Sequence, residues 1–400
     1  MNDPWEEFVR RSRDGACAGY IERGDAPGIP GRWATSFVEP RARFPIGPRD
    51  TTASLEDRTA RTLRGRKDRA LIGYIGFDAV SAFEPLLRKV PPGTPFPIGE
   101  FAVIDRLHLE RVPRRSMHPV ASRESRHPGR PLHETLPQRR FERAVRRARA
   151  AVGDGEAFQV VVATRRSWPR PANLLERAGR LRAVERFAYF YYLRFDDREI
   201  VGASPESALE VRGGRAYISP IAGTLPRGRA RRGRRALEKD PKELAEHRML
   251  VDLARNDLGR ISEAGTVRIL SRERRERFAR LEHLISRVGG RLRPEVGPWE
   301  ALAATFPAGT VSGAPKIRAT QVLRQQERTW RGPYGGAVGL LRGNGDAAWA
   351  LSIRTAFAAA GTLHTAAGAG IVWQSQPRRE YREVLAKLAQ VESTLVGDAR

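Results

Sequence analysis

Residues 188–221 read AYFYYLRFDDREIVGASPESALEVRGGRAYISPI, and this stretch decides the fold. Aromatic and β-branched residues gather in short runs, which is typical of β-strands, and polar or glycine-containing pairs separate the runs. Gly213 and Gly214 form one such pair, a typical two-residue hairpin turn. Strands joined by hairpins are antiparallel, so the stretch predicts several antiparallel strands.

Segments with helical or strand spacing continue on both sides of this stretch. Residues 69–84 predict a buried strand followed by a turn or helix, and 138–152 predict a helix. One face of that helix carries Phe141, Ala144, Val145, Ala148 and Val152. Further strands are predicted at 155–168, 347–357 and 362–367, and further helices at 241–258, 300–306, 315–325 and 377–395. Hairpin strands interspersed with long helices indicate an α+β fold with antiparallel sheet.

The domain organisation follows from a change in composition. The 400 residues are 40% hydrophobic, which is enough for a large core. Residues 113–137 are rich in Arg, Ser, His and Pro and show little apolar periodicity, as is typical of an exposed linker. We therefore predict an N-terminal region at 1–112, a linker at 113–137 and a C-terminal domain at 138–400, with the two regions packed together.

The chain is strongly basic, with a formal net charge of +26 carried mainly by arginine. Such a charge can attract nucleic acid, acidic lipid or an anionic small molecule. The arginines are scattered along the whole chain, and neither an RNA-binding signature nor zinc-finger spacing is present. We therefore interpret most of them as parts of solvated faces, and a basic protein that binds nucleic acid without catalysis stays a remote alternative.

Cys17 is the only cysteine, which excludes a disulfide framework and a multi-cysteine metal site. The first residues, MNDPWEEFVRRSRDG, lack the apolar core of a secretory signal. No window approaches ~18 uninterrupted apolar residues, the length that a membrane span requires. These observations favour a cytoplasmic protein without a membrane partner.

Two predicted helices carry paired carboxylates. Glu243 and Glu246 lie three residues apart in one, and Glu380 and Glu383 repeat the spacing in the other, where Lys387 continues the same face. Either pair alone is typical of a solvated helix surface. Convergence of the two pairs would form an all-oxygen site suited to Mg²⁺.

Three glycine-rich runs also end predicted elements: PIAGTLPRG at 220–228, FPAGTVSGAPK at 306–316 and AAGAGIV at 366–372. Backbone N–H groups exposed in such runs can bind a carboxylate. Each run taken alone is better explained by ordinary turn chemistry.

The motifs together resemble the chorismate-utilising enzyme family, which includes anthranilate synthase large subunits, aminodeoxychorismate synthase component I, isochorismate synthases and salicylate synthases. The motifs occur in the order GASPE, PIAGT, KELAEHRMLVDLARNDLGR, HLISRV, FPAGTVSGAPK, PYGGAVG, IRTAF, GAGIV and EYREVLAK. The resemblance covers residues 158–388. It implies a chorismate-binding fold in which large antiparallel sheets form a two-layered sandwich with helices packed outside.

The resemblance also implies residue roles. The implied metal ligands are Glu246 and Glu383 on Mg²⁺, with Glu243 and Glu380 supporting the metal or its waters. The implied substrate-binding residues are Gly223, Thr224, Tyr334, Arg354, Gly368, Ala369, Gly370 and Lys387, all for chorismate. The implied catalytic residues are Gln159, Glu206, His283 and Thr310. Glu206 corresponds to the acid that protonates the departing ring hydroxyl, and His283 to a residue that handles protons during pyruvate loss.

Two positions distinguish members of the family. Water-using members carry a lysine base where this chain has Gln159, and ammonia needs no such base, so the residue favours amination. Aminodeoxychorismate synthases typically read PIKGT and use the lysine as a covalent nucleophile, which Ala222 cannot replace. The leading hypothesis is therefore anthranilate synthase component I, which adds ammonia at ring carbon 2 and eliminates pyruvate. Aminodeoxychorismate synthase component I and 2-amino-2-deoxyisochorismate synthase are the alternatives.

Other departures from the family concern regulation and partners. Ile21, Glu22 and Arg23 stand where tryptophan-regulated members usually carry Leu-Glu-Ser, which puts tryptophan feedback in doubt. The chain has no glutaminase signature around Cys17, so we expect a separate glutamine amidotransferase subunit to supply ammonia. The sequence leaves open whether the chain forms homo- or hetero-oligomers.

Overall fold

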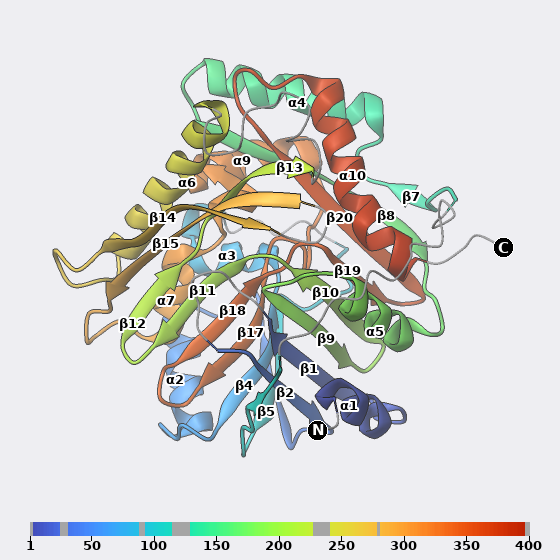
Figure 1. The fold of residues 1–400 in the computed structure, drawn as a ribbon, viewed down its shortest axis with the longest axis vertical. Helices are drawn as coiled ribbons and strands as arrows, with labels where there is room; N and C mark the ends of the chain where they lie inside the picture. The colour runs from blue at the N-terminus through green and yellow to red at the C-terminus, as the bar shows by residue number, and fades with distance from the viewer. Residues whose placement is uncertain are drawn as a thin grey trace.

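A computed structural model describes residues 3–24, 31–87, 93–113, 129–226, 241–277 and 281–396. Side chains are described throughout these ranges except at residues 222–226, 241–243, 276–277 and 281–282. The strands of the described part form two ten-stranded sheets that are antiparallel wherever strands pair, with helices around them (Figure 1). This arrangement confirms the predicted α+β class. No helix among the described residues combines the length and apolar character needed to cross a membrane.

The first sheet joins strands from both ends of the chain. Its strands, in spatial order, are β16 (Gly313–Ala314), β8 (Gln159–Pro169), β20 (Thr362–Ile371), β19 (Thr355–Ala359), β10 (Arg198–Ser204), β9 (Tyr189–Phe195), β1 (Cys17–Arg23), β2 (Trp33–Val38) and β6 (Glu110–Arg111), with β7 (His133–Glu134) beside β8.

The second sheet has the same mixed origin. Its strands, in spatial order, are β13 (Ile221–Pro226), β15 (Leu281–Arg291), β12 (Arg215–Ile218), β11 (Ser207–Arg212), β18 (Ala347–Leu351), β17 (Ala337–Arg342), β4 (Ala70–Ile75), β5 (Gly99–Ile104) and β3 (Ala42–Ile46), with β14 (Arg268–Arg277) beside β15. Strands from before and after the predicted linker thus share both sheets. Residues 114–128 of that linker lie outside the described residues.

The helices cover the outer faces of the sheets and one end of the sandwich. They are α1 (Pro4–Ser12), α2 (Thr52–Leu63), α3 (Val80–Phe83), α4 (Gln138–Gly153), α5 (Leu174–Val184), α6 (Pro241–Gly259), α7 (Pro298–Thr305), α8 (Gly309–Ser312), α9 (Lys316–Glu327) and α10 (Pro377–Leu395), with short 3₁₀ turns η1 (Phe77–Ala79) and η2 (Pro85–Leu87). Helices α1 and α5 pack on the first sheet, and α2, α6 and α7 pack on the second.

Strand β9 shows why these residues form a sheet that is buried on both faces. Tyr189, Tyr191 and Leu193 point into the core between the two sheets, whereas Phe190 and Tyr192 point into the core under α1 and α5. Successive side chains of a strand face opposite sides, so only a strand that is apolar at every position can be buried on both. The central place of β9 between β10 and β1 therefore follows from its composition.

The predicted helices are confirmed to within a few residues, and one predicted strand is wrong. Helix α4 buries Ala151 where the sequence pattern placed Val152, which is only half-buried. Residues 347–357 were predicted as one strand, but they form β18 in the second sheet and β19 in the first. The chain crosses between the sheets at Arg354, whose left-handed backbone (φ +51°) ends the extended run.

Candidate functional site

Two crossings of the chain between the sheets lie next to each other, and each carries a predicted site residue. The first, residues 205–206, joins β10 to β11 and contains Glu206; the second, residues 352–354, joins β18 to β19 and contains Arg354. The crossings are held together by backbone hydrogen bonds from Leu351 N to Glu206 O (3.0 Å) and from Ala203 N to Arg354 O (3.2 Å). The fold therefore places an acid and a guanidinium group side by side.

Glu206 is buried and accepts a hydrogen bond from the Thr310 hydroxyl on α8, with 3.1 Å between Oγ1 and Oε1. Burial raises the pKa of Glu206 to about 8, against the lowering influence of the Thr310 hydrogen bond and of Arg354. The carboxyl group is therefore mostly protonated at neutral pH, which is the state a general acid needs. The structure thus brings together Glu206 and Thr310, which the motifs had supplied as separate residues.

A second group of predicted residues gathers on the paired strands β8 and β20. Gln159 begins β8, and a Cβ added at Gly370 would lie 2.0 Å from its Nε2 atom, so the side-chain amide lies directly against that glycine. Gln159 is buried, and its Oε1 atom has no hydrogen-bond partner within the described part of the chain. A buried acceptor without a partner is costly, and a ligand N–H group would satisfy it.

Tyr334 and Lys387 both lie against Gly368, which stands two residues before Gly370 on β20. A Cβ added at Gly368 would lie 3.0 Å from the Tyr334 hydroxyl, and the Lys387 ammonium on α10 donates to the Gly368 carbonyl at 2.9 Å. Ala369 is buried between the two glycines. Burial raises the pKa of Tyr334 to about 12, so its hydroxyl stays a proton donor. The Gly368 backbone thus lies against a hydroxyl and an ammonium group, both of which can donate hydrogen bonds to a carboxylate.

His283, Gly223 and Thr224 share a third location, on β15 and β13. Ala222 pairs with Leu284 and Leu225 with Glu282, so the backbones of Gly223 and Thr224 lie opposite His283 at an irregularity in the register. Bulges of this kind are frequent beside active sites. His283 is buried. The side chains of Gly223 and Thr224 lie outside the described residues.

The predicted metal ligands lie on two helices, α6 and α10. Glu246 is half-buried and Glu380 buried, whereas Glu383 is exposed and forms a 2.9 Å ion pair with Lys387. The described residues contain no group of three or more acidic, histidine or cysteine side chains that could hold a metal ion. The side chain of Glu243 lies outside the described residues. In its chemistry the donor set fits Mg²⁺, since it offers carboxylate oxygens only.

A buried ion pair beneath this site was not predicted. The guanidinium group of Arg331 bonds Glu327 at 2.6 Å and also donates to the backbone carbonyls of Val311 (2.5 Å) and Val161 (2.9 Å). Glu327 accepts in addition from Ala163 N at 2.9 Å. The pair thus ties α8, which carries Thr310, to β8, which carries Gln159.

A second unpredicted pair fixes the other side of the 306–316 loop. Lys316 is half-buried; its ammonium contacts Asp257 on α6 at 2.7 Å and donates to the Thr305 carbonyl at 2.7 Å. Both residues belong to motifs quoted above, LARNDLGR and SGAPK. The sequence signal was therefore present, and only the contact between the two motifs was not visible in it.

Comparison with known proteins shows the family to which the chain belongs. Residues 30–393 match the family described as chorismate binding enzyme. Anthranilate synthase component 1 of Saccharolobus solfataricus is 33% identical over 98% of this chain and 97% of that protein. Anthranilate synthase component 1 of Streptomyces coelicolor is 38% identical over 79% of this chain and 71% of that protein. The resemblance inferred from the motifs is confirmed.

Solved structures of chorismate-utilising enzymes have the same fold as this chain. Anthranilate synthase component I of Streptococcus pneumoniae superposes with a TM-score of 0.72 at 31% identity, covering 93% of this chain and 89% of that one. The menaquinone-specific isochorismate synthase of Escherichia coli superposes with a TM-score of 0.77 at 17% identity, covering 99% of this chain and 92% of that one. The second likeness shows the shared fold alone, because the identity is low.

Proposed function

Because the chain belongs to the family of chorismate binding enzymes, we propose that it converts chorismate and ammonia into anthranilate and pyruvate, as component I of an anthranilate synthase. Ammonia attacks ring carbon 2 while the ring hydroxyl departs as water. The intermediate, 2-amino-2-deoxyisochorismate, then loses pyruvate and becomes aromatic. Relatives named anthranilate synthase component 1 that match most of the chain support this assignment.

The observation that carries the proposal is the buried carboxyl group of Glu206. Hydroxide is a poor leaving group, so a proton must reach the departing ring oxygen. Glu206 holds a proton at neutral pH because burial raises its pKa to about 8. Arg354 lies beside it and can bind a substrate carboxylate through its forked guanidinium group. The site therefore combines an acid with a cation that orients a dianionic substrate.

Gln159 supports ammonia as the nucleophile. Its amide has no basic group and cannot deprotonate water, but its Oε1 atom, which lacks a partner within the described residues, can accept an N–H from ammonia. Ammonia already has a free lone pair, so it needs orientation and no base. Ala222 offers no side-chain nucleophile, which favours direct attack.

Magnesium is the proposed cofactor, with Glu246 and Glu383 as ligands and Glu243 and Glu380 in support. A bound Mg²⁺ ion would offset the charge of the ring carboxylate and fix its position. Lys387 provides a second positive charge near this carboxylate, on the helix that carries Glu383.

A product assay by mass spectrometry tests the function. The purified chain is incubated with chorismate, Mg²⁺ and an ammonium salt at mildly alkaline pH. Equal amounts of anthranilate and pyruvate are expected. Aminodeoxyisochorismate without pyruvate, or 4-amino-4-deoxychorismate, would replace the proposal by one of the other two aminations, and absence of any product would reject the enzymatic assignment.

Glu246→Gln is expected to raise the Mg²⁺ concentration for half-maximal activity at least about tenfold, because one anionic ligand becomes a neutral amide. Initial rates over a magnesium titration measure the effect. Asp252→Asn is the matched control, since Asp252 lies on the same helix but its side chain is 70% exposed and pairs with Arg255. An unchanged magnesium requirement in Glu246→Gln would remove this residue from the ligand set.

Gln159→Lys is expected to slow amination at least about tenfold and to allow formation of isochorismate, because a lysine at this position can deprotonate water. Products are separated after incubation with and without ammonium. Gln159→Met is the control, since it removes the amide without adding a base and should slow amination without isochorismate. Full amination in both variants would show that Gln159 does not select the nucleophile.

We infer that a separate glutamine amidotransferase supplies the ammonia. A glutaminase needs an accessible cysteine thiolate. Cys17 is buried, and burial raises the pKa of its thiol to about 11, so it does not meet this requirement. Activity with glutamine is therefore expected only after a glutaminase subunit is added, whereas activity with ammonium should not need it.

A further inference from the structure

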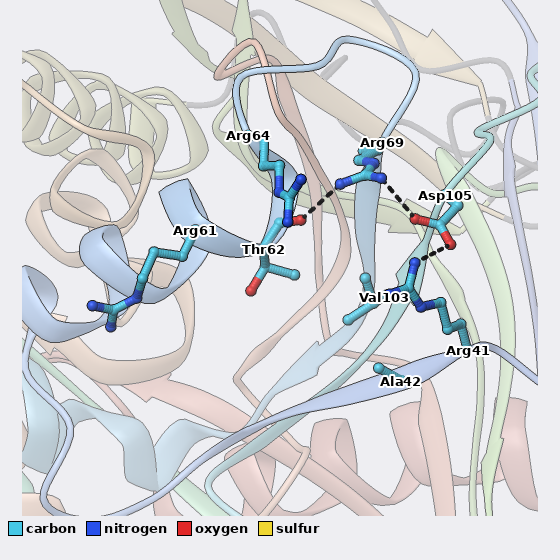
Figure 2. A pocket seen from close by; sticks show the side chains of 8 residues that line it. All are labelled: Arg41, Ala42, Arg61, Thr62, Arg64, Arg69, Val103 and Asp105. Atoms are coloured by element: carbon cyan, nitrogen blue, oxygen red, sulfur yellow. Dashed lines mark hydrogen bonds and ion pairs between the residues drawn. The ribbon is translucent and has the colours of Figure 1, made fainter.

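A cavity of about 310 Å³ lies remote from the crossings, where α2 ends and β3 and β4 begin (Figure 2). Four arginines line it, and one carboxylate accompanies them: Arg41, Arg61, Arg64, Arg69 and Asp105, with Ala42, Thr62 and Val103 completing the wall. Strand β4 separates the cavity from the site: Arg69 directly precedes its first residue, and Phe77, two residues after its last, lies against the Arg331 guanidinium group. None of these eight residues belongs to the catalytic groups described above.

Rigid backbone positions fix the arginines. Arg64 caps α2 in the left-handed conformation, and its N–H donates to the Ala60 carbonyl. Arg69 donates its N–H to the Arg66 carbonyl and accepts from Gly343 N at 3.0 Å in each case. Since the backbone is held in this way, the guanidinium groups are presented to the cavity without an ordering cost for the loop.

The positive charge in the cavity is only partly compensated. Asp105 contacts Arg41 and Arg69, both at 3.4 Å, and Arg69 reaches the Thr62 carbonyl only at 3.4 Å. The buried Nε atom of Arg69 has no hydrogen-bond partner, and Arg64 forms no ion pair, within the described part of the chain. Arg61 points away from the others in Figure 2 and lies 3.7 Å from Asp57. The guanidinium groups of Arg41 and Arg69 therefore share one carboxylate at long distances, and that of Arg64 contacts no carboxylate within the described residues.

We propose that this cavity binds a small dianion, a phosphate ester or a polycarboxylate, through Arg41, Arg64 and Arg69. Guanidinium groups donate paired hydrogen bonds to either kind of anion. The volume is at the lower end of the range for small-molecule sites, which suits a compact metabolite. Ala42 and Val103 offer it a small apolar contact surface.

The alternative explanation for the arginines is that they cap the C-terminus of α2, and it predicts no anion binding. Arginines near a helix C-terminus interact favourably with its carbonyl groups, so they could serve stability alone. In that case Asp105 would stabilise the arginines and no anion would compete with it. If an anion binds, Asp105 occupies part of its place and weakens its binding.

Isothermal titration calorimetry of the full chain tests the proposal, with inorganic phosphate, pyrophosphate and citrate as separate probes at constant ionic strength. Saturable binding of at least one probe is expected, and comparison of the three distinguishes phosphate from carboxylate recognition. Arg64→Gln and Arg69→Gln should each weaken binding at least about tenfold. Arg61→Gln is the matched control on the same helix and should bind within about twofold of the unchanged protein.

The direction in which Asp105→Asn changes dianion affinity distinguishes the two explanations. Its side chain is partly exposed, so the variant should fold, and removal of the competing charge should tighten dianion binding roughly fivefold. Weaker binding in this variant, equal losses in Arg61→Gln and Arg64→Gln, or no saturable heat with any probe would each overturn the proposal. Activity with chorismate is not used as a readout, so the outcome is independent of the proposed function.

Discussion

Glu206→Gln is expected to lower kcat with chorismate and ammonia by about a hundred- to ten-thousand-fold, the usual contribution of a positioned general acid. Glutamine keeps the shape and can still accept the hydrogen bond from Thr310, but it cannot give a proton to the departing hydroxyl. KM should change little, because the arginine, lysine and tyrosine groups that would bind the carboxylates are untouched. Steady-state kinetics at saturating ammonium measure the loss.

The titration of Glu206 should determine how kcat falls at alkaline pH. Glu206 is active when protonated, so kcat should fall as the pH rises through about 8, the value to which burial raises its pKa. The free ammonia concentration must be kept constant at each pH, since it also changes over this range. Thr310→Val should move the limb to higher pH, because the Thr310 hydrogen bond lowers the pKa of Glu206.

The raised pKa of Glu206 should also make the stability of the protein depend on pH. The unfolded carboxyl loses its proton near its ordinary pKa of 4.5, whereas the folded one keeps it up to about 8, so the folded state binds more protons between these values. Its free energy of unfolding therefore falls as the pH rises, by roughly 3–5 kcal/mol in total from this group. Glu206→Gln lacks this dependence and should gain stability over the wild type between pH 5 and 8. Urea denaturation at several pH values measures the free energy of unfolding of both proteins. An equal pH dependence in the wild type and in Glu206→Gln would contradict the raised pKa of Glu206.

Glu327→Gln is expected to lower the free energy of unfolding by about 3–5 kcal/mol, because it leaves the guanidinium group of Arg331 buried without its counter-charge. Arg331 is 5% exposed and packs against the rings of Phe77 and Tyr334, so water cannot replace the lost carboxylate. The midpoint of urea denaturation measures the change.

Glu156→Gln is the matched control for this experiment. Glu156 pairs with Arg318 at 2.7 Å, but both side chains are about two-fifths exposed. An exposed pair contributes at most about 1 kcal/mol. Equal losses in the two variants would show that the buried pair does not hold α8 and β8 together.

Sequence patterns predicted the local features of the fold well. Gly213 and Gly214 form the two-residue turn between β11 and β12, both with positive φ, as the hairpin pattern indicated. The apolar periodicity of residues 138–152 predicted α4 and most of its buried face. Both features depend on neighbours in the sequence, and such features are the ones that periodicity and turn chemistry report.

Features that depend on distant segments were not predictable in this way. Residues 347–357 are apolar enough for one strand, and nothing local shows that the chain changes sheets at Arg354. In the site, the motifs supplied Glu206 and Thr310 as separate residues, and their hydrogen bond follows only from the adjacent crossings. Arg331 and Glu327 have ordinary helix-pair spacing, so burial is what distinguishes them from a surface pair.

The interleaving of early and late strands has a consequence for synthesis of the protein on the ribosome. Strand β4 ends at Ile75, but its partner β17 begins only at Ala337; β1 ends at Arg23, and its partner β9 begins at Tyr189. The nascent chain therefore carries unpaired strand edges while more than half of it is still being made. Contacts between such distant segments slow folding, and open edges favour aggregation. Translation speed and chaperone supply, more than the stability of the finished molecule, should limit the yield of this enzyme in a cell.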